Sequence, residues 1–222
     1  MATKNTVAEI RPLDIQKVKV TIESDTPLIM HKWSDKAKKE MLDAQQGKKK
    51  GKAKEYKNPV ADFIRSMYWL EGEPDIEGLN EEECEEAFMK AVENGARFGF
   101  PAVAFKKATI SSAYRMGWSK DKVSLQGAFY FEADENGMIE IKSDTPIMRE
   151  DMVKIGMGTA DLRYRGEFHN WSAELTIVYN ANGQYDLNNI IQMLNAGGYT
   201  CGVGEWRTEK GGMNGMYHVK TV

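Results

Sequence analysis

Residues 202 to 219 read GVGEWRTEKGGMNGMYHV, and their five glycines surround one tryptophan and two strongly cationic side chains. Glycine lets a backbone approach a sugar–phosphate chain closely. An arginine fork pairs with phosphate oxygens, and a tryptophan face stacks on an unpaired base. This pattern predicts a strand of nucleic acid held by Gly202, Gly204, Trp206, Arg207 and Lys210. The alternative is that the glycines only form a turn before a last strand.

A second candidate segment, MREDMVKIGMGTADLRYRGEFHNW, is irregular and basic in composition and mixes cations with methionines and aromatic rings. In strand geometry Arg163 and Arg165 share one face while Tyr164 takes the other. Guanidinium groups match phosphates, and aromatic or thioether surfaces accept unstacked bases. We therefore predict further contacts from Arg149, Lys154, Arg163, Tyr164 and Arg165. The alternative is a solvated hairpin whose methionines reach the core.

Charge is unevenly distributed along the chain, although its net value is only −3. Ten lysines against four acidic residues lie between positions 32 and 57, and ten acidic residues against one lysine lie between 71 and 93. Local patches of this kind attract polyanions whatever the overall charge. Further candidates are therefore Trp33, Lys48, Lys49, Lys50, Lys106, Lys107 and Arg115. The alternatives are a solvated loop for the lysine run, solvated helix lysines, and a core-edge role for Trp33.

Signatures of catalysis are sparse in the chain. His31, His169 and His218 lack the spacing of a zinc site, and no esterase or phosphate-loop motif occurs. We interpret Cys84 and Cys201 as reduced thiols, and we expect no catalytic residue, metal or cofactor. Isolated aspartates beside turns are more often caps than Mg²⁺ ligands. No run approaches the ~20 apolar residues of a membrane span, and no secretory signal is visible, so we expect a cytoplasmic protein.

The periodicity predicts an α+β fold. Alternation predicts strands at 17–22, 123–131, 138–142 and 171–180, with a hairpin turn at 133–137 and further strands at 199–206 and 216–222. Helices are predicted from Asn80 to Gly95, from Pro101 to Gly117, and from an Asp186 cap to a stop at Gly197 and Gly198. The order is that of a ferredoxin-like (RRM-type) βαββαβ core with an antiparallel sheet. The core covers 1–33 and 99–222, and 34–98 is a helical, charge-segregated insertion without strands.

Four segments carry a resemblance to known proteins: TPLIMHKWSDKAKKEM, GFPAVAFKKA, RYRGEFHNWSAELTIVYN and GVGEWRTEKGGMNGMYHV. They resemble a group of phage-encoded proteins similar in build to the RAMP superfamily, the RNA-binding backbone subunits of CRISPR effector complexes. In that superfamily the glycine loop and the basic excursion hold single-stranded nucleic acid, which implies the same role for the residues named above. Some members cleave RNA with a histidine by the first helix or an aspartate after the first strand. Here that helix has no histidine and Asp25 precedes Thr26-Pro27, so binding is expected and cleavage is not.

The function expected from the sequence is binding and coating of single-stranded nucleic acid, with DNA favoured over RNA, in phage replication or recombination. The protein would act in the host cytoplasm as a homo-oligomer or filament on the strand, with no membrane partner. The first alternative is a metal-dependent nuclease that uses Asp25 or Asp35. The second is a phage structural or host-interaction protein that docks through 34–98. Whether the insertion closes over nucleic acid, joins subunits, or pairs its own two halves stays open.

Overall fold

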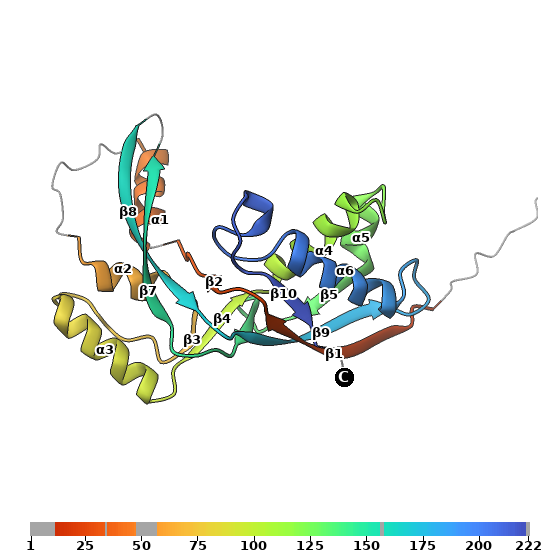
Figure 1. Ribbon diagram of the computed structural model, residues 1–222, viewed down its shortest axis with the longest axis horizontal. Coiled ribbons are helices and arrows are strands. Elements are labelled where there is room, and N and C mark those ends of the chain that lie inside the picture. The colour runs from red at the N-terminus through yellow and green to blue at the C-terminus, as the bar shows by residue number, and fades with distance from the viewer. Residues whose placement is uncertain (1–11, 34, 48–56, 156–157, 221–222) are drawn as a thin grey trace, which may run out of the picture.

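The computed structural model describes residues 12–33, 35–47, 57–155 and 158–220. Within them the strands form three antiparallel sheets (Figure 1). The four-stranded sheet has the order β10-β1-β9-β5, with β1 at Ile15–Ser24, β5 at Phe129–Glu132, β9 at Ser172–Asn180 and β10 at Tyr217–Val219. The others are β2-β8-β7 (Leu28–Ile29, Thr159–Phe168, Ile147–Ile155) and β3-β4-β6 (Trp69–Glu71, Arg97–Pro101, Met138–Ile141). The predicted α+β class with antiparallel strands is confirmed.

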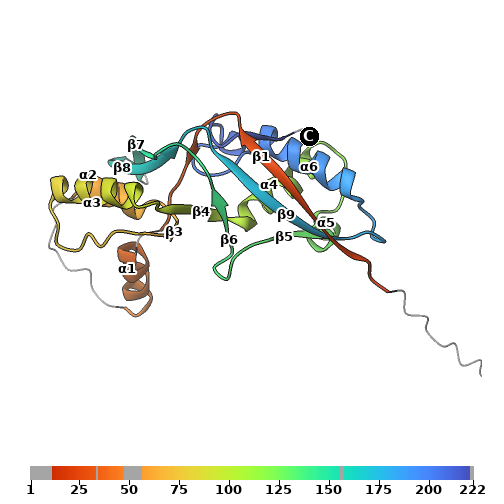
Figure 2. The same cartoon turned by 90° about the horizontal axis from the view of Figure 1, so that it is seen from below.

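The four-stranded sheet is built around β1, as the alternation of its residues predicts. Val18, Val20 and Ile22 turn toward the core, while Lys17 and Lys19 on the opposite face are exposed. The β1–β9 ladder runs from Ile15↔Asn180 to Glu23↔Ser172. Helices α4 (Ala102–Arg115), α5 (Lys122–Ala128) and α6 (Leu187–Thr200) lie on the core side (Figure 1). Seen from below, no described helix covers the other face (Figure 2).

Helix α6 begins as predicted but does not end at its glycines. Asp186 forms a capping box with Asn189, and the helix then continues through Gly197 and Gly198 to Thr200. A Cβ on Gly198 would lie 1.8 Å from the carbonyl oxygen of Tyr217. A Cβ on Gly197 would lie 3.0 Å from the backbone nitrogen of Thr109. The two glycines therefore allow α6 to approach β10 and α4 closely, and they do not stop the helix.

Replacing Gly198 with alanine is expected to destabilise the fold by about 1–3 kcal/mol, because the added methyl group meets backbone that cannot move away as a side chain would. Urea unfolding of both proteins measures the difference. Gly127→Ala in α5 is the matched control, since a Cβ there has nothing within 4 Å. That control should be neutral or slightly stabilising. Equal stability of the two variants would contradict the close approach of α6 to β10.

The segment 34–98 is only partly helical, so the expectation that it contains no strand is wrong. It holds α1 (Asp35–Gln45), α2 (Pro59–Arg65) and α3 (Glu81–Glu93), and α3 has the predicted capping box between Asn80 and Glu83. It also holds β3 and the first two residues of β4. These strands are short and pair within a sheet that includes β6, so the sequence shows no alternation there. The division of the chain into a core and an insertion stays a prediction.

Three predicted elements in the second half of the chain need correction. The expected strand 123–131 begins as α5, with Asp121 as its N-cap, and only Phe129–Glu132 is strand. The turn at 133–137 closes no hairpin, because β5 pairs with β9 whereas β6 pairs with β4. Residues 199–206 end α6 and enter a loop without forming a strand. The last predicted strand is present as β10.

The segment expected to be irregular is a regular β7–β8 hairpin, paired from Ile147↔Glu167 to Ile155↔Thr159. It projects from the body of the molecule (Figure 1). The two methionines of the hairpin that the structure describes do not reach the core: Met148 is 43% exposed and Met152 is 72% exposed. At its base, Gly166 N–H donates at 2.9 Å to the Oγ of Ser66, the C-cap of α2. The base of the hairpin is therefore fixed, while its outer part faces solvent.

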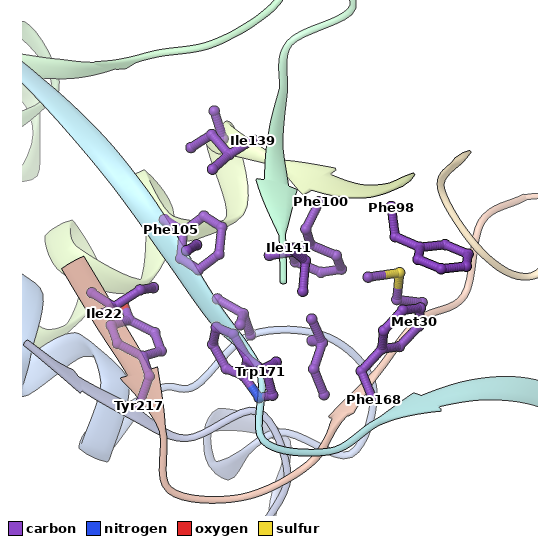
Figure 3. Close-up of a cluster of buried hydrophobic side chains, with 14 of the residues drawn as sticks. Ile22, Met30, Phe98, Phe100, Phe105, Ile139, Ile141, Phe168, Trp171 and Tyr217 are labelled. Carbon is purple, nitrogen blue, oxygen red and sulfur yellow. The ribbon is translucent and has the colours of Figure 1, made fainter. Parts of the chain in front are cut away.

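The core is one cluster of buried side chains that joins the sheets (Figure 3). Trp171 packs against Phe105 and Tyr217, and its indole N–H donates to Thr26 O at 2.9 Å. The rings of Phe98 on β4 and Phe168 on β8 are 5.3 Å apart, so the two smaller sheets share this core. None of the helices in the described ranges is both long and apolar enough to cross a membrane.

Candidate nucleic-acid interface

Two hollows meet at His31, which lines both of them. The chain after β2 is held in place because Met30 N–H donates to Gly166 O and Lys32 N–H donates to Ser66 O. This strip lies between the β7–β8 hairpin and the C-terminal loop (Figure 1). We call the cavity against the hairpin, of about 630 Å³, the hairpin hollow. The cavity against residues 202–209, of about 420 Å³, is the glycine-loop hollow. Together they form the groove.

The hairpin hollow has a cationic lining with aromatic side chains. Six of its lining residues are lysine or arginine and two are aspartate: Lys32, Lys57, Arg65, Lys154, Arg163 and Arg165 against Asp62 and Asp161. Trp33, which is 57% exposed, and Tyr164 also line it. Cations beside accessible rings are the combination that single strands use for their phosphates and bases. This one cavity therefore brings together three predicted residues that are not arginines: Trp33, Lys154 and Tyr164.

The cations of the hairpin hollow differ in how far they are already neutralised. Arg65 and Lys154 are exposed, and no carboxylate of the described residues forms an ion pair with either. Lys32 lies 3.8 Å from Glu73, which is a long ion pair. Lys57 and Arg163 share Asp161, at 3.2 and 2.7 Å. Arg65 and Lys154 are therefore the cations of this hollow best placed to take a phosphate.

Arg165 is held in a buried network at the base of the hairpin. Its Nη1 donates to Asp151 Oδ2 at 2.9 Å, and its Nε donates to His31 Nδ1 at 2.8 Å. Arg149 donates to Asp151 and to Glu167, each at 2.9 Å, and the hydrogen bond that Glu167 accepts raises the pKa of Arg149. Both arginines are predicted phosphate contacts. In the structure both arginines form ion pairs with carboxylates, and these ion pairs stabilise the hairpin.

His31 is neutral near physiological pH. Burial, followed by the charge of Arg165, lowers the pKa of His31. Because Nδ1 accepts the hydrogen bond from Arg165, the proton of the neutral ring sits on Nε2. The junction of the two hollows therefore carries a fixed N–H donor in place of a positive charge.

The C-terminal loop is tightly packed, and most of its glycines serve that packing. A Cβ on Gly204 would lie 2.5 Å from Ile29 O, and one on Gly212 would lie 1.7 Å from Trp206 O. Trp206 has a φ angle of +50°, and the residue is 44% exposed. A bulky residue in left-handed backbone is strained, and such strain concentrates at functional sites. The loop therefore holds an exposed indole on a rigid support, which combines the two alternatives drawn from the sequence.

The remaining predicted residues are distributed unequally. Lys107 is exposed and lines the glycine-loop hollow. Gly202, Gly204 and Arg207 line the same hollow. Arg207 and Arg115 both form ion pairs with Glu209. Lys210 is exposed on the same loop. Lys106 points elsewhere, because its Nζ donates to Gln126 O, and burial lowers its pKa. Lys48, Lys49 and Lys50 lie outside the described residues.

The uncovered face of the four-stranded sheet is not a cationic surface. Each lysine or histidine on it pairs with a carboxylate: Lys17 with Glu132, Lys19 with Glu174, Lys220 with Glu23, and His218 with Asp25. The lysine charges on this face are therefore neutralised locally. Arg65, Lys107 and Lys154, by contrast, line the groove and form no ion pair with a described carboxylate.

Several groove residues were not predicted from the sequence, namely His31, Lys32, Lys57, Arg65, Tyr68 and Glu205. Within the described ranges no three His, Cys, Asp or Glu side chains gather as metal ligands would, and Asp25 pairs with His218 at 2.8 Å. The groove is thus a cationic surface with exposed rings and one neutral histidine. No family model matches this chain, and no curated protein is similar enough to it to count as a match.

Proposed function

We propose that this protein binds single-stranded nucleic acid along the groove. The observation that carries the proposal is the excess of cations over carboxylates in the hairpin hollow, next to the exposed ring of Trp33 and the half-buried ring of Tyr164. Arg65, Lys154 and Lys107 supply positive charge to phosphates along the two hollows. Trp33 and Trp206 supply ring faces for bases. Each element of the proposal thus has a described side chain with the required charge or surface.

The preference for a single strand follows from the aromatic contacts. A ring can stack only on a base that is not already stacked within a duplex, whereas phosphate contacts alone serve duplex and single strand alike. The groove offers both kinds of contact, so the single strand gains more. We favour DNA over RNA because we propose that the protein acts in phage replication or recombination.

The proposal includes a ferredoxin-like core and a RAMP-type ancestry. The strand order β10-β1-β9-β5, with α4 before β5 and α6 before β10, supports that core, because it is the order that two interleaved βαβ units produce. We place the protein in the host cytoplasm, where it coats single strands as a homo-oligomer during phage replication or recombination. Neighbouring subunits would extend the short groove of one copy along the strand.

The test is a binding assay with labelled thymidine oligonucleotide, uridine oligonucleotide and a duplex, each with and without Mg²⁺. Single strands should bind in proportion to their length and remain intact, and the duplex should bind more weakly. Equal affinity for duplex and single strand would contradict the stacking contacts. Mg²⁺-dependent cleavage would favour the nuclease alternative. Absence of binding at low salt would overturn the proposal.

Trp206→Ala is expected to weaken single-strand binding by about 1–3 kcal/mol, the usual contribution of one stacked base. Fluorescence anisotropy with a thymidine oligonucleotide measures it. Trp118→Ala is the matched control, since Trp118 is 48% exposed but, unlike Trp206, does not adjoin residues that line the groove. Alanine keeps the same left-handed backbone, so the unfolding free energy should change little. Equal losses in the two variants would show that Trp206 makes no specific contact.

A further inference from the structure

The glycine-loop hollow has the size and lining of a pocket for a single planar group. Its volume of about 420 Å³ lies within the usual range of small-ligand sites. One wall is apolar and comes from the end of β4 and the start of α4, with Phe100, Pro101 and Ala104. The polar residues that line the hollow include His31, Tyr68 and Glu205, and the Tyr68 ring packs edge-on against the Phe100 ring. Apolar surface beside a few polar groups is the lining that binds and orients an aromatic ring.

Glu205 is the unexplained charge of this pocket. Its backbone is fixed because its N–H donates to Ile29 O at 3.0 Å, and its side chain is half-buried. None of the described residues forms an ion pair or a hydrogen bond with its carboxylate. A half-buried carboxylate without donors is unfavourable, and in a groove for phosphates it also repels the ligand. Both costs disappear if the bound group brings N–H donors to it.

His31 and Tyr68 supply hydrogen-bond donors to the pocket, while its second carboxylate, Glu209, is already paired with Arg115 and Arg207. His31 presents Nε2–H, because its Nδ1 accepts from Arg165. Burial and then the charge of Glu205 raise the pKa of Tyr68, so its hydroxyl keeps its proton. The complementary ring therefore carries adjacent N–H groups for Glu205 and acceptor atoms for His31 or Tyr68.

Guanine is the nucleobase with this pattern. Its N1–H and N2 amino group are adjacent donors that a carboxylate accepts together, and its O6 and N7 are acceptors. Adenine and cytosine place a ring acceptor beside their amino group, and thymine flanks its one N–H with two carbonyls. Those acceptors would face the carboxylate and repel it.

We propose that the glycine-loop hollow takes one guanine, unstacked from the bound strand, and that Glu205 determines this preference. The inference rests on the proposed single-strand binding and names the base that the site selects. Lys107, exposed on the rim, lies where it can pair with a phosphate adjoining the inserted base.

The test compares thymidine oligonucleotides that carry one central guanine, adenine, cytosine or hypoxanthine. The guanine oligonucleotide should bind about tenfold tighter than all-thymidine, which is within the range for one bidentate base contact. Hypoxanthine lacks the N2 amino group and should lose most of that gain. In Glu205→Gln the preference should vanish, while affinity for all-thymidine stays the same or rises slightly, because a negative charge has been removed.

The two proposals fail in different ways. If all-thymidine binds but the four central bases bind alike, the guanine pocket is overturned and single-strand binding stands. If no oligonucleotide binds, the proposed function itself is overturned. A preference for another base, or a guanine preference that survives Glu205→Gln, also overturns the assignment to Glu205. The comparison requires that Glu205→Gln unfold at the same temperature as the wild type. Glu205→Ala provides a second variant.

Discussion

Replacing Arg165 with alanine is expected to lower the free energy of unfolding by about 3–5 kcal/mol, the cost of leaving one member of a buried ion pair without its partner. Only 7% of the Arg165 side chain and 9% of the Asp151 side chain are exposed. The variant would leave Asp151 with Arg149 as its one remaining cation, and it would remove the hydrogen bond to His31. Urea unfolding followed by circular dichroism measures the change.

Arg163→Ala is the matched control for Arg165→Ala. Arg163 lies two residues away on β8, and the side chains of Arg163 and its ion-pair partner Asp161 are 39% and 30% exposed. Exposed pairs contribute about 0–1 kcal/mol, so this variant should unfold almost like the wild type. A double-mutant cycle of Arg165→Ala with Asp151→Ala isolates the coupling between the two charges. If Arg165→Ala proved as stable as the control and lost only binding, Arg165 would be a phosphate contact and not a support for the hairpin.

The role of these arginines shows where the sequence stops being informative. An arginine side chain correctly indicates a contact with anionic oxygens, but which anionic group it contacts depends on the register of the hairpin. Arg149 lies directly opposite Arg165, a pairing that would be repulsive without carboxylates between the two. Asp151 and Glu167 supply them. Since the segment was expected to be irregular, no register could be assigned and the internal pairing could not be predicted.

Elements with a local signal were predictable and elements formed by tertiary pairing were not. The alternation of β1 and β9 and the caps of α3 and α6 depend on neighbours in sequence. By contrast, β2 has two residues and β3 has three, too few to show a period, and both exist because they pair with β8 and β4. His31 reaches the groove only through that pairing of β2. The sequence therefore indicated Trp33 and candidate residues on the glycine loop and the hairpin, whereas it gave no indication of His31, Lys32 or Arg65.

The largest functional effect is expected from removing three groove cations together. Arg65→Ala, Lys107→Ala and Lys154→Ala should weaken single-strand binding on the order of a few hundredfold at about 50 mM salt, if each cation neutralises one phosphate. The slope of log affinity against log salt should become shallower by about 2, since each phosphate contact on a single strand contributes about 0.7. Titration of a labelled thymidine oligonucleotide at several salt concentrations gives both values.

The uncovered sheet face provides a control of equal charge. Lys17→Ala, Lys19→Ala and Lys220→Ala together remove the same three positive charges, but each of these lysines already pairs with a glutamate on an exposed surface. Losing them frees three carboxylates far from the groove, so affinity and salt slope should change little. Equal losses in the two triple variants would mean that binding follows net charge alone. No loss in either variant would show that phosphates are not held in the groove.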